Sequence, residues 1–220
     1  PTAWGRGRTG GSRWRRRRRS YRPTKPRRRT TESDHGAALA ALGLTGGPAT
    51  RLAGYLDTLA AWSRRVNLTG ARTAGERVRL LVADVLAAAC LPAPGSLIDV
   101  GSGNGSPGLV FALLRDDLDV TLLEPRVRRW AFLREAARGA GRPVRVLRQR
   151  HDGYVGPPAR TVTVRGIALP LAELAGLVEP GGLLVVFGGR PRGGGPFTET
   201  REGRGLAGGA GGVTVFRRLG

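Results

Sequence analysis

The stretch that decides the fold is Leu97-Ile98-Asp99-Val100-Gly101-Ser102-Gly103-Asn104-Gly105-Ser106-Pro107-Gly108. An apolar run ends in Asp99, glycines follow at alternate positions, and a helical pattern begins at Leu109. This order predicts a strand, a tight turn and the start of a helix, which is where α/β folds bind nucleotide-like ligands. Because glycine tolerates positive φ angles and lets the backbone approach a ligand closely, we expect a ligand loop here.

Three interpretations of this loop are open: a site for S-adenosylmethionine, a dinucleotide site and a turn without a ligand. The spacing of Gly103, Gly105 and Gly108 matches the dinucleotide fingerprint. Asp99 favours S-adenosylmethionine, because a carboxylate repels a pyrophosphate and attracts a sulfonium or ammonium group. Glu124 ends the next expected strand, where a carboxylate can accept hydrogen bonds from ribose hydroxyls. Glu124 therefore supports a nucleoside ligand without choosing between the two cofactors.

From residue 95 onward, apolar runs alternate with helical patterns. The expected strands cover residues 96–100, 119–124, 143–147, 160–164 and 182–187, and the expected helices cover 107–115, 126–139 and 168–177. This alternation predicts a doubly wound, parallel sheet. Residues 188–212 are rich in glycine and give no clear prediction, whereas residues 213–216 are expected to form a last strand at or near an edge.

The region before the sheet is expected to be a helical cap over residues 32–94, followed by the ligand-binding domain over residues 95–220. Apolar side chains recur at helical spacing from Leu52 to Trp62. The run Thr45-Gly46-Gly47-Pro48 is expected to break the helical pattern before them, and a further helix is expected over about residues 74–89.

Residues 1–31 are expected to be a disordered basic tail. The chain has 220 residues and a net charge of +21, and 13 of its 37 lysines and arginines lie in this tail, which contains no acid. Such a composition buries too little surface to fold alone. The tail has three possible origins: an arm that binds RNA through phosphate contacts and stacking, an organellar presequence, or translated upstream sequence.

Composition also excludes several classes of function. Cys90 is the only cysteine and His35 and His151 are the only histidines, so neither a disulfide framework nor a metal site is expected. The longest apolar run, residues 80–91, is interrupted by Asp84 and is too short to span a membrane. We expect a cytoplasmic monomer that does not associate with membranes. The basic charge suits a polyanion such as nucleic acid.

The residues around the loop resemble the RsmG/GidB family of small-subunit (16S) ribosomal RNA guanine-N7 methyltransferases over about residues 40–190. The resemblance is carried by the loop with its Pro107, and by Trp62-x4-Asn67-Leu68-Thr69-Gly70, Asp84-Val85-Leu86, Leu122-Leu123-Glu124 and Arg128-Arg129-x2-Phe132-Leu133-Arg134. It implies a class I S-adenosylmethionine-dependent methyltransferase fold. Such a fold is a Rossmann-like, doubly wound, mostly parallel sheet, here with an N-terminal helical cap.

The resemblance also implies a set of cofactor-binding residues, which are Asp99, Gly101, Ser102, Gly103, Gly105, Pro107, Leu109, Glu124, Arg150 and Arg165. Arg165 is in addition the candidate catalytic residue and is expected to contact a phosphate or guanine O6; the alternative is an ion pair at a strand end. For Arg150 the alternative is a pairing with Asp152, two residues away. The arginines at positions 126, 128, 129 and 134 are candidates either for RNA contacts or for a solvated face.

The implied reaction forms 7-methylguanosine in ribosomal RNA, with the small ribosomal subunit as partner. Guanine N7 presents a lone pair and loses no proton, so catalysis needs positioning rather than a general base. This chain has Leu81 and Val85 where the family has His and Ser, and only Arg190 stands near a family Lys. Two alternatives therefore remain: a methyltransferase of another substrate, and a catalytically degenerate RNA-binding or ribosome-assembly factor with the same fold.

Overall fold

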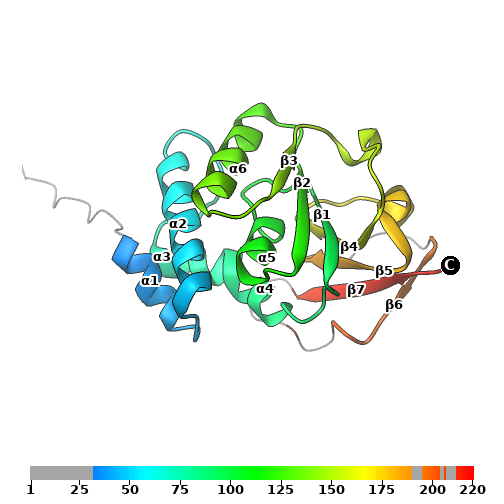
Figure 1. Cartoon of the computed structure of the whole chain (residues 1–220), viewed down its shortest axis with the longest axis horizontal. Helices are drawn as coiled ribbons and strands as arrows, with labels where there is room; N and C mark the ends of the chain where they lie inside the picture. The colour runs from blue at the N-terminus through cyan, green and yellow to red at the C-terminus, as the bar shows by residue number, and fades with distance from the viewer. Residues whose placement is uncertain (1–31, 190–194, 204–205, 207–211) are drawn as a thin grey trace, which may run out of the picture.

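The computed structural model describes residues 32–189, 195–203, 206 and 212–220 (Figure 1). The predicted tail over residues 1–31, Arg190 and much of the glycine-rich stretch lie outside these described residues.

Seven strands of the described part form one sheet in the order β3-β2-β1-β4-β5-β7-β6. Their bounds are β1 Gly95–Val100, β2 Leu118–Leu123, β3 Arg145–Leu147, β4 Ala159–Arg165, β5 Val178–Phe187, β6 Phe197–Glu199 and β7 Val213–Arg218. The first five strands are parallel, whereas β7 is antiparallel to both β5 and β6. This confirms the mostly parallel, Rossmann-like sheet. The strand order reverses between β1 and β4, and such a switch point is where open α/β sheets bind ligands.

Helices cover the two faces of the sheet unequally (Figure 1). The helical segments are α1 Glu32–Ala40, α2 Gly46–Trp62, α3 Ala74–Val78, the π-helical η1 Arg79–Ala83, α4 Asp84–Ala87, α5 Gly108–Leu114, α6 Val127–Gly139, the short η2 His151–Gly153, α7 Leu171–Leu174 and η3 Ala175–Leu177. The larger core packs the cap helices, α5 and α6 against one face of the sheet. The smaller core packs α7 and η3 against the other.

Several predicted elements differ from the structure; for example, β5 begins at Val178, four residues before the predicted strand. The break expected at Thr45–Pro48 is present but lies earlier, at residues 41–45 between α1 and α2, because α2 begins at Gly46. Pro48 lies in the first turn, where its missing N–H would have no intrahelical partner in any case. The helix expected over residues 168–177 begins only at Leu171, after Pro170. The strand β6 was not predicted, since three residues at a sheet edge leave no periodic pattern to detect.

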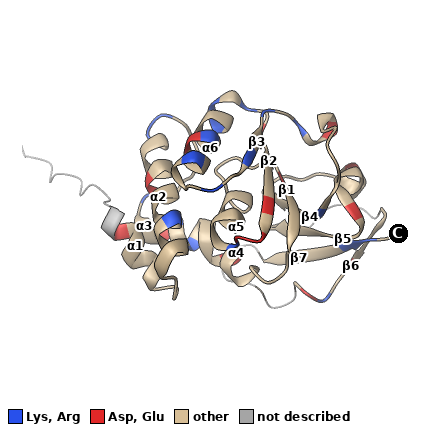
Figure 2. Ribbon diagram, viewed as in Figure 1, with Lys and Arg blue, Asp and Glu red and all other residues tan. Residues whose placement is uncertain are grey.

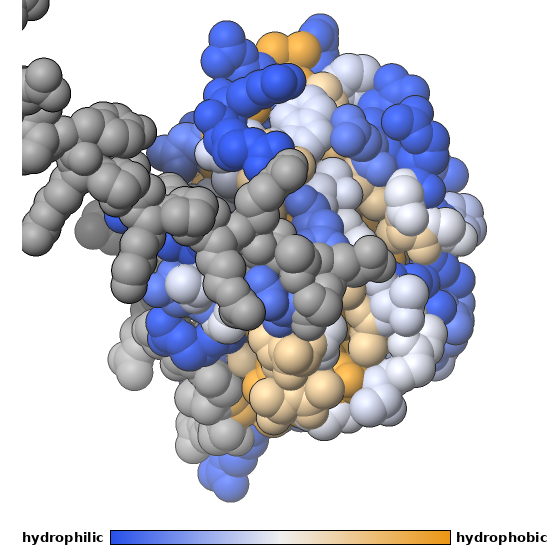
Figure 3. All heavy atoms as spheres, turned by 90° about the vertical axis from the view of Figure 1, so that its left-hand side faces the viewer, coloured by the Kyte–Doolittle hydropathy of each residue, from blue (hydrophilic) through white to orange (hydrophobic). Residues whose placement is uncertain are grey.

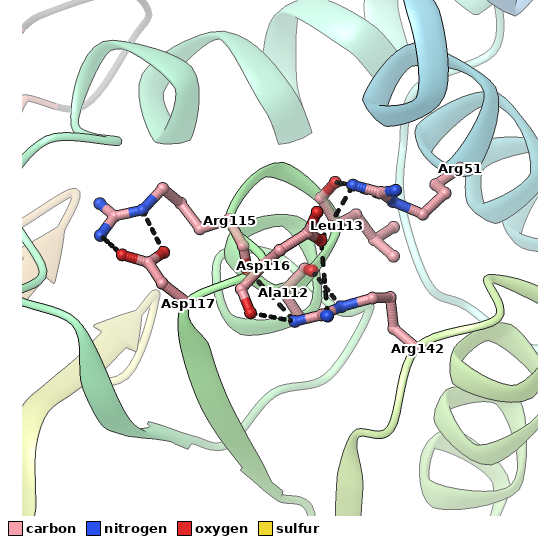
Figure 4. Close-up of polar contacts among 7 residues, drawn as sticks. All are labelled: Arg51, Ala112, Leu113, Arg115, Asp116, Asp117 and Arg142. Carbon is pink, nitrogen blue, oxygen red and sulfur yellow. Dashed lines mark hydrogen bonds and ion pairs between the residues drawn. The ribbon is translucent and has the colours of Figure 1, made fainter.

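Two arginines hold the carboxyl end of α5, the helix that follows the ligand loop (Figure 4). Arg51 of α2 donates from Nε and Nη2 to the Leu113 carbonyl at 3.2 and 3.0 Å, and Arg142 donates from Nε to the Ala112 carbonyl at 3.2 Å. The Asp116 carboxylate lies 3.3 and 3.4 Å from these two guanidinium groups. The last carbonyls of a helix lack intrahelical partners and carry partial negative charge, so cationic donors stabilise this end.

We predict that Arg142→Gln lowers the free energy of unfolding by about 1–2 kcal/mol, because charge-assisted hydrogen bonds to α5 are lost. Chemical denaturation measures this loss. The matched control is Arg145→Gln, which removes the same charge from an exposed position in β3 and is expected to change stability by less than about 0.5 kcal/mol. Equal effects of the two substitutions would contradict a capping role for Arg142.

Candidate functional site

A cleft of about 560 Å³ opens at the carboxyl ends of β1, β2 and β4. The ligand loop contributes residues 101–104 and Ser106 to its lining. The end of β2 and the segment after it contribute residues 124–126, the first turn of α6 contributes Arg129, and the end of β4 contributes residues 165–168. The cleft therefore lies at the switch point of the sheet, where the loop predicted it.

Glu124 is the best-defined acceptor in this cleft. Its carboxylate is held by two backbone donors: Gly103 N–H donates to Oε2 at 3.0 Å, and Arg126 N–H donates to Oε1 at 2.8 Å. The residue is only 3% exposed. A carboxylate has about four lone-pair sites, so two remain for a ligand. The carboxylate is thus fixed in place and can still accept hydrogen bonds from hydroxyl groups.

Two glycines are required where the loop packs closely. Gly101 has a φ of +68°, a conformation that residues with a side chain rarely adopt. At Gly108, the first residue of α5, a Cβ would lie 2.3 Å from Cβ of Asp99. Real atoms do not approach so closely, so the helix can begin against the end of β1 only because position 108 is glycine.

Asp99 lies beneath the loop rather than in the lining of the cleft. It is fully buried, and its Oδ1 accepts a hydrogen bond of 2.6 Å from the Thr163 hydroxyl. Its Oδ2 has no hydrogen-bond partner among the described residues. Burial raises the pKa of Asp99 from 3.8 to about 6, and the hydrogen bond from Thr163 opposes the rise. Asp99 therefore influences the cleft through its charge and through the loop, not by direct contact.

The helical cap holds the other side of the loop. Tyr55 of α2 donates its hydroxyl to the Asn104 carbonyl at 2.8 Å, and Asn104 Nδ2 donates to the Leu68 carbonyl at 3.2 Å. Ser106 Oγ donates to the Leu81 carbonyl at 2.6 Å. From the sequence, Tyr55 was recognisable only as one of the apolar side chains that recur at helical spacing between Leu52 and Trp62. A hydroxyl on the buried face of a helix needs a partner, and that requirement is the signal that could have singled it out.

Arg165 contacts groups of the chain itself. Its Nη1 donates to the Leu80 carbonyl at 2.7 Å, and its Nη2 lies 3.6 Å from Oδ2 of Asp84 in α4. Its guanidinium also lies 4.9 Å from the ring centre of Phe187. Burial lowers the pKa of Arg165, and the charge of Asp84 opposes that change. The structure thus favours the ion pair, one of the two alternatives left open by the sequence, although Arg165 also lines the cleft.

Besides Asp99, four of the predicted cofactor-binding residues do not line the cleft. Gly105 packs against the Tyr55 ring, and Pro107 and Leu109 lie at the start of α5, where Leu109 is buried in the core. Arg150 is 64% exposed and pairs with Asp152 at 3.1 Å. The structure therefore does not bring Arg150 to the loop, because its side chain folds back across its own turn.

The other titratable groups lie elsewhere. His35 pairs with Asp57 and His151 pairs with Glu173, and neither histidine lines the cleft. Within the part of the chain that the structure describes, no three His, Cys, Asp or Glu side chains are placed to hold a metal ion. No helix in this part is long and apolar enough to cross a membrane.

Comparisons with known proteins identify the family of this chain. Residues 49–190 match the GidB family, described as rRNA small subunit methyltransferase G. The ribosomal RNA small subunit methyltransferase G of Halorhodospira halophila is 39% identical over 145 residues, 63% of this chain and 68% of that protein. The protein of the same name in Rhodospirillum centenum is 38% identical over 158 residues, 69% of this chain and 72% of that protein.

Among solved structures, one that is similar is coclaurine N-methyltransferase bound to N-methylheliamine and SAH. It has a TM-score of 0.46 and 15% sequence identity, and the match covers 71% of this chain and 57% of that one. The chain belongs to the GidB family, the family of rRNA small subunit methyltransferase G.

Proposed function

We propose that this chain transfers a methyl group from S-adenosylmethionine to N7 of a guanine in small-subunit ribosomal RNA. The observation that carries the proposal is Glu124, which is fixed by two backbone N–H groups at the wall of the loop cleft. A carboxylate at the end of the second strand of such a sheet is suited to ribose hydroxyls. Membership of the GidB family makes the chain a methyltransferase and supports ribosomal RNA as its substrate.

The charges around the cleft fit a cationic cofactor. Asp84, Asp99 and Glu124 are all buried, and Arg165 lies against Asp84. The other two arginines of the lining, Arg126 and Arg129, are exposed and half-buried, so the buried charges around the cleft are mainly negative. An excess of buried negative charge favours a ligand that carries a sulfonium and an ammonium group over a pyrophosphate. S-adenosylmethionine supplies an activated methyl group on such a sulfonium.

The residues of the chain would then act mainly by positioning. Guanine N7 attacks with its own lone pair, so no side chain has to remove a proton. Glu124 would hold the ribose, while Gly101, Ser102 and Gly103 would bring the backbone close to the cofactor. We assign Arg165 as a positioning residue, because its contacts with Leu80 and Asp84 hold the cap against the end of β4.

The direct test uses small ribosomal subunits from cells that lack the gene, incubated with the purified chain and labelled cofactor. We expect 7-methylguanosine in the digested small-subunit RNA. Glu124→Gln is the variant that tests the carboxylate. One side of the new amide is an NH₂ group, which would face the N–H of Gly103 or of Arg126 and cannot accept its hydrogen bond. The affinity of this variant for S-adenosylmethionine should fall by roughly 10- to 100-fold. A methyl group on another base or atom would contradict the N7 assignment. If the chain does not bind S-adenosylmethionine at millimolar concentration, it is not an active methyltransferase.

The second test concerns Asp99. Because its folded-state pKa is raised to about 6, the folded protein binds this proton more tightly than the unfolded chain does. The contribution of Asp99 to the free energy of unfolding therefore falls as pH rises from about 4 to about 6, by about 3 kcal/mol in total. Asp99→Asn removes this ionisation and keeps an acceptor for Thr163.

As pH rises from 4 to 7, we expect Asp99→Asn to become more stable relative to the wild type. Chemical denaturation at several pH values measures this difference. We also expect weaker binding of S-adenosylmethionine in calorimetry, since the negative charge beneath the loop is lost. A stability difference that does not change with pH would rule out a raised pKa at Asp99. Unchanged cofactor affinity would rule out its electrostatic role.

The third test concerns the contact between the cap and the loop. Tyr55→Phe removes the hydroxyl that donates to Asn104 and should raise the KM for the cofactor several-fold, the effect of about 1 kcal/mol, without changing kcat. Tyr154→Phe is the matched control, because the Tyr154 hydroxyl makes no side-chain hydrogen bond within the described residues. If both variants raise KM equally, the Tyr55 hydroxyl does not position the loop.

A further inference from the structure

A groove of about 610 Å³ lies between the carboxyl end of α2 and the helix α6, outside the cofactor cleft. Arg64 and Arg65, which follow α2, and Arg128, in the first turn of α6, line this groove. All three arginines are exposed. The lining also includes one carboxylate, Glu135, and the side chain of Trp62. The groove is therefore basic, with three guanidinium groups to one carboxylate.

This groove adjoins the cofactor cleft through the first turn of α6. Arg129, the neighbour of Arg128, lines the cleft and donates to the Asn67 carbonyl at 3.3 Å, and Arg126 lines the cleft as well. In Figure 2 several positions of the α6 ribbon are coloured as Lys or Arg, and in Figure 3 the upper part of the adjoining face, at the level of α2 and α6 in Figure 1, is mainly hydrophilic. Arg134 instead lies over the Trp130 ring at 4.9 Å.

These arginines lack the acidic partners that other arginines have. Arg51 and Arg142 pair with Asp116, whereas Arg64, Arg65 and Arg128 form no ion pair with any residue that the structure describes. The first turn of α6 contains no acid, although the amino end of a helix carries partial positive charge. The positive charges therefore repel one another until an anion binds. Guanidinium groups match phosphate oxygens in pairs of parallel hydrogen bonds.

We propose that this groove binds the phosphodiester backbone of the RNA strand that enters the cofactor cleft. The identity of the ligand rests on the proposed function, whereas the binding itself does not depend on turnover. Trp62 is half-buried and packs edge to face on Phe132, with ring centres 6.0 Å apart, so its ring is held against the core. The groove therefore offers charge rather than base contacts, and it binds RNA without regard to sequence.

The test compares two triple variants of the full chain. Arg64→Gln, Arg65→Gln and Arg128→Gln remove the charge of the groove, while Arg138→Gln, Arg145→Gln and Arg201→Gln remove the same charge from exposed positions elsewhere. Fluorescence anisotropy of a labelled single-stranded fragment of small-subunit RNA is measured over a salt series. We expect about tenfold weaker binding for the groove variant, and a slope of log affinity against log salt that is smaller by about 2. The control variant should change much less.

A second variant gives an effect of opposite sign, which a folding defect would not produce. Glu135→Gln removes the carboxylate of the groove and should tighten RNA binding a few-fold. Equal losses in the two triple variants, an unchanged affinity of the groove variant, or competition by polyglutamate as strong as that by RNA would overturn the proposal. If the wild type forms no 7-methylguanosine while the groove variant still loses RNA affinity, the proposed function fails and the groove assignment stands.

Discussion

The packing of Gly108 against Asp99 is the constraint on which the rest of the site depends. A side chain at position 108 would overlap Asp99, so α5 can begin against the end of β1 only with glycine there. This contact buries the Asp99 carboxylate beneath the loop and fixes where the loop turns. The cleft then opens above the loop, and Glu124 reaches it from the next strand. One close contact thus determines both the shape of the cleft and the buried charge below it.

The helical cap helps to build the cleft at the loop and is not only a surface above it. Tyr55, Leu68 and Leu81 of the cap region make hydrogen bonds to the loop, and the cap helices share one apolar core with α5, α6 and the sheet. Ordering the loop and folding the cap are therefore coupled. A ligand that stabilises the loop must also stabilise the cap, because the same contacts serve both.

The sequence predicted the fold well where a local pattern carries the information. The apolar runs that became β1, β2 and β4, and the loop after β1, follow from periodicity and from glycine placement. The side chains that reach the cleft could not be read in the same way. Arg150 turns back to Asp152, and Arg165 pairs with Asp84, which lies 81 positions earlier in the chain. Contacts between such distant residues depend on how the elements pack, and a single sequence does not reveal that packing.

The charges around the cleft and the groove differ in depth, and this difference distinguishes the two proposed sites. Asp99 and Glu124 lie buried beneath and beside the cleft, where water and salt screen them little. Arg64, Arg65 and Arg128 are exposed in the groove, where mobile ions screen them strongly. A small cation in the cleft therefore meets a field that changes little with ionic strength, whereas a polyanion in the groove must displace counterions.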